Sequence, residues 1–378
     1  MKIILNGVYF GGNCPIFYKV LKDLGHDVKV YDVLFTNSYN EFSDLINEED
    51  LIIPKYSFFI FLKLRLYRKF LKKKWINILV KKVNDFIIDF KPDVIFNHQI
   101  SIRSNVMLKT KFKPQFNFVY GSEIKQKNKT NSDLKFAIEN AEYTFVPSLE
   151  AQNILLNYFP DLSNKLCLST TNFIYPDKLM KTYLNCDIVK VRNDYNYLKD
   201  DFIIYDNRSL RNINLSLNLV KAIKLLKDSS YDCKMILVKG YSGSDQVIEV
   251  IKDKISDWKL TNHISIIDES ITDKSHYELL ALSDAYCSIL KADEFGSGIA
   301  QAMYFEKLLL LSNLEVYKQY IKDNAVYVNK LNYKDIFDSI INLINKNYKI
   351  DFKYNYDLVD KKFNALKNIE FILNKVKK

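Results

Sequence analysis

The stretch Ser283–Asn313, SDAYCSILKADEFGSGIAQAMYFEKLLLLSN, carries the pattern that decides the fold. It predicts a strand over Ala285–Leu290, an acidic and glycine-rich loop over Asp293–Gly298, a helix over Ile299–Glu306 and a buried strand over Leu308–Leu311. A strand that runs through glycines into a helix puts free backbone N–H groups and the positive end of the helix dipole at one point. Such a point suits phosphate, and the acidic residues beside it suit sugar hydroxyls.

The same alternation of strands and helices runs through the rest of the chain. The other predicted strands are Ile3–Leu5, Val28–Tyr31, Val94–Asn97, Phe116–Val119, Tyr143–Val146, Phe202–Tyr205, Met235–Val238 and Ile264–Ile267. The other predicted helices are Pro15–Leu24, Leu149–Asn157 (with Ser148 as its N-cap), Ser216–Lys227, Ser244–Trp258, Ser275–Leu282 and Tyr333–Asn345. This order predicts an α/β fold with parallel sheets and right-handed crossovers.

A chain of 378 residues is longer than one ordinary domain, so we expect two Rossmann-like domains. The polar stretch 187–201 lacks clear periodicity and is the predicted linker between a domain over 1–186 and a domain over 202–355. The final segment, 356–378, has helical spacing and is expected to pack back on the first domain. Ligands of open α/β sheets bind at the carboxyl ends of the strands, so we expect the two sheets to face each other across a cleft.

The net charge of +10 and a pI near 9.0 favour anionic partners. The segment 57–83, SFFIFLKLRLYRKFLKKKWINILVKKV, interleaves aromatic and aliphatic residues with nine basic residues and has no acidic one. This pattern is typical of a helix on an anionic membrane surface, and equally of an ordinary amphipathic helix with solvated lysines. Nucleic acid is not expected as a partner, because no recognition module accompanies the basic segment.

Cysteine and histidine usage argues against disulfides and metal sites. The five cysteines are scattered, odd in number and never spaced as CxxC, and the four histidines are widely separated. No signal peptide and no apolar run of roughly 20 residues is evident, so the predicted location is the cytoplasm, with peripheral attachment to the inner face of the cytoplasmic membrane as an option. We expect neither a cofactor nor a metal.

Several motifs occur in an order that resembles a known family. In the first half they are Gly11 and Gly12 after the first strand, LGHDVKVY at 24–31, KPDVIFNH at 91–98, YGSEI at 120–124 and AEYTFVPSLEAQNIL at 141–155. In the second half they are YDNRSLRNINLSL at 205–217 and DEFGSGIAQAM at 293–303. Over nearly its whole length the chain resembles the retaining glycosyltransferases of family four, which have the GT-B fold.

The resemblance implies roles for residues of the second half. Arg208, with Arg211 in reserve, would hold the diphosphate of a nucleotide-sugar donor, and Asp293 would accept hydrogen bonds from the donor sugar. Gln301 stands where the family places the glutamate that binds ribose. The implied donor-binding residues are Gly12, Arg208, Arg211, Glu269, Ser270, Glu294, Phe295, Gly296, Ser297, Gly298, Ile299 and Gln301.

Each of these assignments has a structural alternative. Arg208 could be a surface arginine, Asp293 could cap backbone N–H groups before a helix, and Glu269 could sit in an ordinary loop. In the first half, His98 and Tyr120 join Asp293 and Arg208 as candidate catalytic residues. A lone histidine, however, is more often structural, and a tyrosine with a pKa near 10 is a poor base. The candidate acceptor-binding residues are Gly11, Gly121 and Glu123.

The chain departs from the family pattern at five positions. Asp293 and Gln301 replace the paired glutamates, Tyr120 replaces a histidine, Ile213 a lysine and Glu294 a glycine. Two functions follow: an enzyme that transfers sugar to a bacterial surface glycan or glycolipid (lipopolysaccharide, lipooligosaccharide, capsule or lipid-linked oligosaccharide), or a catalytically weakened partner subunit of a glycosylation complex. An NAD-dependent oxidoreductase is disfavoured because GxGxxG is missing after the first strand. The sequence leaves open the base, sugar, acceptor, linkage and oligomeric state.

Overall fold

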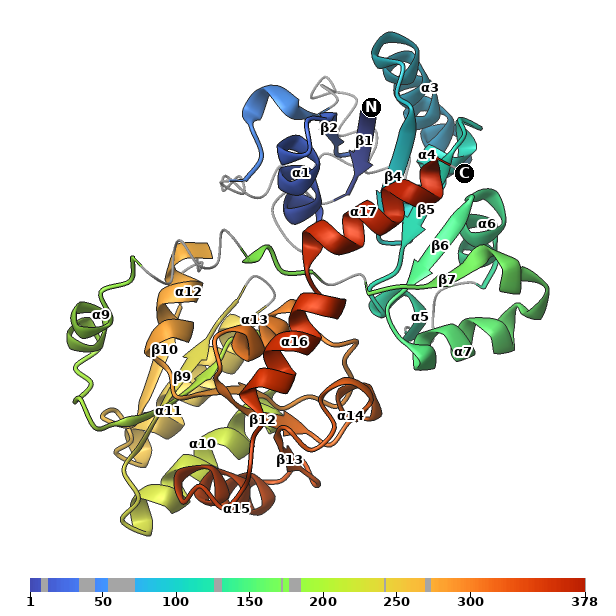
Figure 1. The fold of residues 1–378 in the computed structure, drawn as a ribbon. Helices are drawn as coiled ribbons and strands as arrows, with labels where there is room; N and C mark the ends of the chain where they lie inside the picture. Colours follow the sequence, from blue (N-terminus) through green and yellow to red (C-terminus); the bar gives the residue numbers. More distant parts are fainter. Residues whose placement is uncertain are drawn as a thin grey trace. The chain divides into compact units, whose positions relative to one another are not determined.

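The computed structural model of the protein describes residues 1–7, 13–33, 45–53, 72–125, 131–170, 173–176, 185–240, 243–268 and 273–377. The chain forms two compact units (Figure 1). The first comprises Met1–Tyr175 together with Phe363–Lys378, and the second comprises Pro176–Lys362. Each unit is a parallel sheet covered by helices, as the alternating pattern predicts.

The sheet of the first unit has seven parallel strands in the order β3-β2-β1-β4-β5-β6-β7. Every residue of its central strand β4 is buried, since helices cover both faces. The strands are β1 (Lys2–Asn6), β2 (Asp27–Tyr31), β3 (Leu51–Ile52), β4 (Val94–His98), β5 (Gln115–Phe118), β6 (Tyr143–Val146) and β7 (Leu166–Leu168).

The helices of the first unit include one from the far end of the sequence. Ala365, Ile369 and Ile372 of that helix, α17, are buried in the same core cluster as Phe17 of α1. Burying an isoleucine side chain contributes about 2 kcal/mol, so α17 is part of this core. The helices are α1 (Cys14–Asp23), α3 (Lys72–Phe90), α4 (Ile102–Lys109), α5 (Ser122–Lys125), α6 (Asn131–Asn140), α7 (Leu149–Tyr158) and α17 (Ala365–Val376), with short 3-10 turns at Glu48–Asp50 and Pro160–Lys165.

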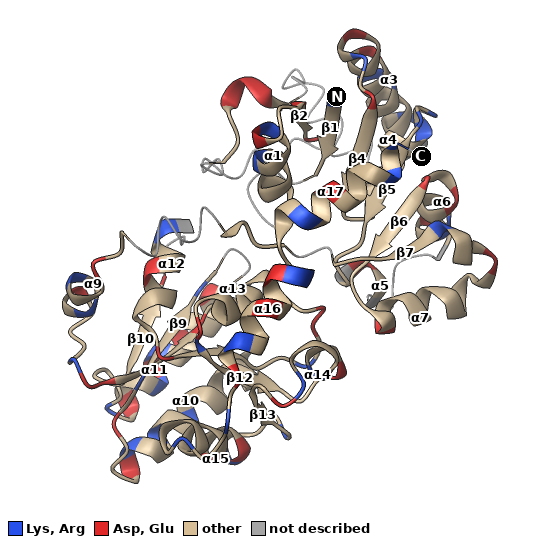
Figure 2. Cartoon of the chain, viewed as in Figure 1, with Lys and Arg blue, Asp and Glu red and all other residues tan. Residues whose placement is uncertain are grey.

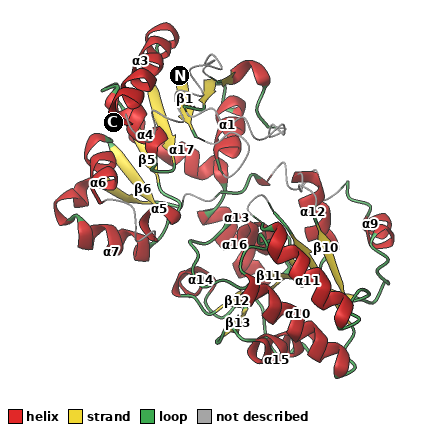
Figure 3. Ribbon diagram, turned by 180° about the vertical axis from the view of Figure 1, so that it is seen from behind, coloured by secondary structure: helices red, strands yellow, loops and turns green. Residues whose placement is uncertain are grey.

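The second unit has six parallel strands in the order β10-β9-β8-β11-β12-β13, with helices on both faces (Figure 3). Its strands are β8 (Phe202–Asp206), β9 (Cys233–Val238), β10 (Ile264–Ile267), β11 (Ala285–Ser288), β12 (Leu308–Ser312) and β13 (Val326–Val328). Its helices are α9 (Ile188–Asp194), α10 (Ile213–Asp228), α11 (Asp245–Asp257), α12 (Asp273–Leu282), α13 (Ser297–Tyr304), α14 (Glu315–Ile321), α15 (Tyr333–Ile344) and α16 (Phe352–Lys362).

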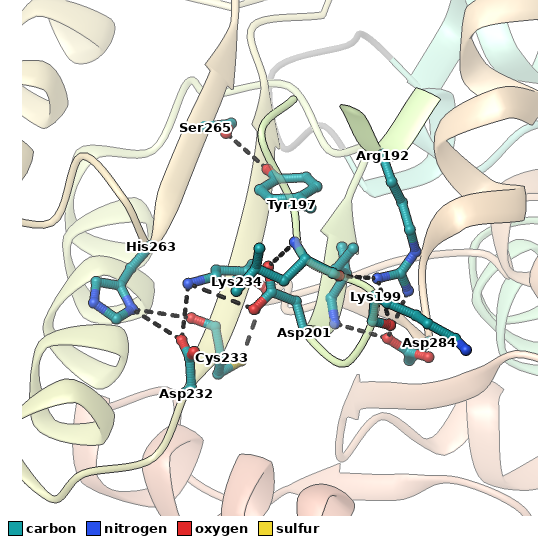
Figure 4. Close-up of polar contacts among 12 residues, drawn as sticks. Arg192, Tyr197, Lys199, Asp201, Asp232, Cys233, Lys234, His263, Ser265 and Asp284 are labelled. Carbon is teal, nitrogen blue, oxygen red and sulfur yellow. Dashed lines mark hydrogen bonds and ion pairs between the residues drawn. The ribbon is translucent and has the colours of Figure 1, made fainter. Parts of the chain in front are cut away.

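Charged groups fix the chain at the amino end of this second sheet (Figure 4). Arg192 of α9 donates to the carbonyl oxygens of Leu198 at 2.7 Å and Lys199 at 3.2 Å. Lys234 of β9 pairs with the buried carboxylate of Asp201 at 3.7 Å and with Asp232 at 2.8 Å. These contacts attach the segment before β8 to the sheet that it enters.

Two regions differ from the sequence-based expectation. The segment 187–201, the predicted linker, forms α9 and lies within the second unit. None of the α9 residues is buried, so the helix leaves no hydrophobic periodicity in the sequence; Asp187 starts it by accepting a hydrogen bond from the Lys190 N–H. The final segment is two helices rather than one: α16 lies in the second unit and α17 in the first.

A side-chain cap explains where that final segment breaks. The Asn364 side chain accepts hydrogen bonds from the backbone N–H groups of Leu366 and Lys367 and so starts α17 anew. Acidic and basic residues are spread over the helices of both units, so the net charge is not gathered on one element of the described chain (Figure 2).

Candidate functional site

The start of α13 lies at the carboxyl edge of the second sheet, just after β11. Gly296 is the N-cap and supplies no side chain, so the first turn lacks a side-chain cap. The Ile299 N–H donates to the Gly296 carbonyl at 3.0 Å, whereas the N–H groups of Ser297 and Gly298 have no acceptor among the described residues. Two backbone donors at the positive end of a helix are therefore open to an anion.

The Arg208 guanidinium lies against this helix start. Its Nη2 donates to Asp293 Oδ2 at 2.8 Å and its Nε donates to Ser288 Oγ at 3.1 Å. A Cβ on Gly296 would come within 2.7 Å of Nη2, so only glycine allows this approach. The Arg208 side chain is still 28% exposed and can receive a ligand.

One carboxylate oxygen of Asp293, Oδ2, connects three parts of this region. It accepts hydrogen bonds from Arg208, from the Tyr317 hydroxyl at 2.8 Å and from the Gly296 N–H at 3.1 Å. The last bond is the one expected if Asp293 were a helix-capping residue. The structure thus shows the capping contact, and the proposed contact of Asp293 with a sugar stays a prediction.

The pKa values of Arg208 and of its neighbour Asp206 are both shifted. Burial opposes the charge of Arg208, but Asp293 together with Tyr286, Tyr317 and Asp206 outweighs it and raises the Arg208 pKa, so the cation is permanent. Burial also raises the pKa of Asp206 to about 7, although the backbone N–H and the charge of Arg208 act in the opposite direction. One fixed positive charge therefore stands beside a carboxyl group that titrates near neutral pH.

Gln301, one turn into α13, is held by a residue that the sequence analysis did not single out. Its Oε1 lies 2.8 Å from Nε2 of His276, and the other ring nitrogen of His276 lies 2.8 Å from the Tyr205 hydroxyl. His276 is on α12 and Tyr205 is on β8. No motif pointed to His276; a sequence signal for it could only have come from placing α12 beside α13.

The remaining predicted donor-binding residues are placed differently. Glu294 is buried, and Phe295 is buried with its ring against Tyr317 and Tyr320. The φ of +60° at Phe295 is a left-handed backbone conformation that bends the loop toward the helix start. Arg211 is exposed and takes no part in the Arg208 network. Gly12, Glu269 and Ser270 lie outside the described residues.

In the first unit, the buried His98 and the partly buried Tyr120 form an aromatic pair at the carboxyl edge of β4 and β5. His98 Nδ1 lies 2.6 Å from the Tyr120 hydroxyl, and its ring stacks on Phe118 at 5.1 Å. Burial lowers the pKa of His98 to about 3 and raises that of Tyr120 well above its usual value. Both side chains are therefore neutral at physiological pH, and neither is suited to take up a proton there.

Glu123 is fully enclosed beside this pair. Its carboxylate accepts the backbone N–H groups of Tyr120 and Ile100, each at 3.2 Å, and so fixes the two loops that follow β4 and β5. Gly121 has a φ of +93°, which favours glycine at that turn. Gly11 lies outside the described residues. A pocket of about 80 Å³ opens here, lined by Ile100, Ser101, Ile102, Asn105, Glu123, Asp133 and Leu134.

The described residues contain no group of three or more His, Cys, Asp or Glu side chains placed to hold a metal ion. Of the helices described, none is both long and apolar enough to cross a bilayer.

Comparison with known proteins agrees with this architecture. The family described as "Glycosyl transferases group 1" matches residues 187–357. The chain superposes over 100% of its length on a glycosyltransferase from Rickettsia africae, with a TM-score of 0.75, 18% identity and 98% of that chain covered. It also superposes over its whole length on Anabaena HepE in complex with UDP and glucose, with a TM-score of 0.74, 13% identity and 99% of that chain covered.

A third solved structure, the sucrose-phosphate synthase of Thermosynechococcus elongatus, gives a TM-score of 0.72 at 13% identity, with 100% of this chain and 99% of that chain covered. No curated protein sequence matches. Two parallel sheets of this topology, matched end to end by these enzymes, are the GT-B fold, as the motif order predicted. Residues 187–357 thus match the glycosyl transferases group 1 family, and the chain as a whole has the GT-B fold.

Proposed function

We propose that the second unit binds a nucleoside-diphosphate sugar with the diphosphate at the start of α13. The observation that carries this proposal is the pair of open N–H groups, Ser297 and Gly298, beside the permanent cation Arg208. Asp293 uses only part of the hydrogen-bonding capacity of the Arg208 guanidinium, and the Arg208 side chain is partly exposed. Arg208 can therefore donate a further hydrogen bond to the ligand. No cofactor is needed for this chemistry, and we propose that it proceeds without a metal.

Glycosyl transfer builds negative charge on the departing diphosphate. Fixed donors aimed at that charge accelerate the reaction, and removing one such donor typically costs about 100- to 1,000-fold in rate. Arg208 and the N–H groups of Ser297 and Gly298 supply such donors here. We propose no protein nucleophile; the departing phosphate oxygen takes the acceptor's proton while the sugar keeps its anomeric configuration.

The donor sugar and the ribose occupy opposite sides of the diphosphate in this proposal. Asp293 and Gln301 stand four residues before and four residues after Ser297, so each side of the helix start has one polar side chain. We assign Asp293 to the sugar and Gln301 to the ribose. Because Anabaena HepE was solved with UDP-glucose, a UDP-sugar is the first donor to test.

For the acceptor we propose a hydroxyl of a bacterial surface glycan or glycolipid, bound near Gly121 and Glu123 of the first unit. The basic balance of the chain supports an anionic acceptor or membrane surface. Of the basic segment 57–83, residues 57–71 lie outside the described residues. On the described part, α3, Lys74 and Lys81 are exposed alongside Ile78, a combination suited to an anionic lipid surface.

This attachment has a direct test. The protein should co-sediment with vesicles that contain anionic lipid at low salt, and less so as salt screens the lysines. Vesicles of neutral lipid are the control. Absence of binding to the anionic vesicles would remove the membrane from the proposal.

One observation favours the second candidate, a weakened partner subunit. Gln301 lacks the charge of a carboxylate, and its carbonyl oxygen is already engaged by His276. Donor hydrolysis separates the two candidates: an enzyme slowly releases nucleoside diphosphate from its donor without acceptor, whereas a partner subunit does not.

The main experiment is a thermal-shift panel of UDP, GDP, CMP and dTDP sugars, with and without EDTA. A ligand that binds only the folded state raises Tm, by an amount that grows with concentration over Kd. We expect one nucleotide class to raise Tm in both buffers. If no nucleotide sugar shifts Tm and no nucleoside diphosphate is released, the donor site at α13 is wrong.

A further inference from the structure

His276 of the second unit lies beside the candidate donor site but has no role in the proposal so far. It bridges two elements: its Nε2 meets Gln301 of α13 and its Nδ1 meets Tyr205 of β8, both at 2.8 Å. Tyr205 is fully buried, and Gln301 is 7% exposed. A chain of three side chains thus runs from the middle of the sheet to the side of the candidate donor site.

The buried hydroxyl of Tyr205 fixes the direction of these hydrogen bonds. Among the described residues its only partner is His276, so its proton must be donated to Nδ1 or be left buried without an acceptor. An unsatisfied buried donor costs about 1 to 3 kcal/mol. With Nδ1 as the acceptor, Nε2 of neutral His276 carries the proton and donates it to the Gln301 carbonyl.

This direction settles which end of the Gln301 amide faces outward. The carbonyl oxygen is taken by His276, and the Gln301 NH2 group makes no hydrogen bond within the described residues. The outward group is therefore a donor only, whereas a glutamate at this position would be an acceptor only. Reversing the amide would place its NH2 against Nε2 and leave the Tyr205 proton without an acceptor.

We infer that His276 is a positioning residue: it holds the Gln301 amide so that its NH2 group donates to a ribose hydroxyl oxygen of the bound nucleotide. The inference rests on the proposed function, because it needs the diphosphate at the start of α13. The ribose is bonded directly to that diphosphate, and Gln301 lies one helical turn from the diphosphate site.

The test compares ribose with deoxyribose. The probe is whichever of UDP, GDP and CDP gives the largest thermal shift, together with its 2′-deoxy and 3′-deoxy forms; Kd is measured by calorimetry. We expect the wild type to bind the ribonucleotide about tenfold tighter than one deoxy form, the loss of roughly one hydrogen bond. His276→Ala and Gln301→Ala should reduce that preference to within about twofold.

Three further variants separate positioning from folding. Tyr205→Phe removes one hydroxyl and keeps the buried ring. This variant should lose part of the preference for ribose over deoxyribose, and it remains a test even if His276→Ala does not fold. His276→Gln keeps one hydrogen-bond donor and one acceptor, so it should retain part of the ribose preference that His276→Ala loses. The matched control is His263→Ala: that histidine lies near Asp232 at the opposite end of the sheet, so its loss should leave the preference intact.

The outcomes distinguish the inference from the function beneath it. If no ribonucleotide binds the wild type, the proposed donor site and the inference fail together. If the ribonucleotide binds but His276→Ala and Tyr205→Phe keep the full ribose preference, only the inference is overturned. A rise in donor KM with little change in kcat for hydrolysis supports positioning at the ribose, since the ribose lies away from the bond that breaks.

Discussion

The two ends of the second unit's sheet carry charge networks of similar composition, but the backbone groups beside them differ in whether they are satisfied. At the amino end, Lys234 pairs with Asp201 and Asp232, and Arg192 donates to backbone carbonyls (Figure 4). At the carboxyl end, Arg208 pairs with Asp293 beside the open N–H groups of α13. Arginine and aspartate occur at both ends, so residue type alone does not separate a structural network from a site.

The difference lies in what is left unsatisfied. Arg192 is used by the carbonyls of Leu198 and Lys199, which need donors because the loop has no sheet partner there. The Arg208 guanidinium instead lies against Gly296, at a helix start whose first backbone N–H groups have no acceptor among the described residues. Unused N–H donors at the carboxyl end, against satisfied carbonyl acceptors at the amino end, are what mark the carboxyl end as the candidate ligand site.

The largest expected effect comes from removing the arginine at each end. Arg208→Ala should lower the rate of nucleoside diphosphate release from the donor by about 100-fold or more, because it removes a donor to the leaving group. Arg192→Ala should lower Tm yet leave the rate per folded molecule within about twofold. Rates are measured on protein whose folded fraction is known from circular dichroism. Equal losses of rate in both variants would erase the contrast between the two ends.

Next in size is the buried ion pair at the amino end. Lys234→Ala leaves the Asp201 carboxylate, 2% exposed, without its cation and should destabilise the fold by about 3 kcal/mol, as for other broken buried pairs. The double variant Lys234→Met, Asp201→Asn should recover much of this, because it buries no unpaired charge. Chemical denaturation measures both. Nucleotide Kd should stay unchanged; a weakened Kd would mean that the amino end also serves the ligand.

The smallest effect is a pH dependence at the carboxyl end. Burial raises the Asp206 pKa from 3.8 to about 7, so this carboxyl group ionises in the unfolded chain first as the pH rises. The protonated Asp206 carboxyl group therefore costs the folded state nothing below about pH 4. Between about pH 4 and 7 the free energy of unfolding falls, because the unfolded chain loses this proton and the folded chain keeps it; above pH 7 the contribution is lost. Asp206→Asn keeps an oxygen for the Arg208 N–H and removes the charge.

We expect Asp206→Asn to gain on the order of 2 kcal/mol relative to wild type between pH 5 and pH 8. The measurement is the unfolding free energy of both proteins at several pH values. A constant difference over that range would show that Asp206 does not titrate there.

Periodicity in the sequence predicted the fold, and motif order selected the candidate site residues. The strands at 143–146 and 264–267 were predicted at their observed bounds, since their apolar runs end at clear turn residues. Arg208 and Asp293, 85 residues apart, were both assigned to the site and lie 2.8 Å apart. Local pattern and order along the chain were enough for these.

What escaped prediction depends on packing between elements. The contact of His276 with Gln301 needs the side-by-side placement of α12 and α13, which no spacing encodes. The contacts of Glu123 with the backbone N–H groups of Tyr120 and Ile100 depend on two loops that lie far apart in the sequence, while its proposed contact with an acceptor stays a prediction. Helix α9 buries nothing and so has no hydrophobic period to detect.

The placement of α17 has a consequence for biosynthesis. The ribosome makes every strand of the first unit before residue 170, yet α17, which completes its core, is not made until the entire second unit has been synthesised. The apolar face that α17 covers, around Phe17 of α1, must wait uncovered during that time. The half of the protein that is translated first therefore cannot complete its core until α17 has been made, and a nascent chain stalled before residue 365 would expose a surface suited to chaperones.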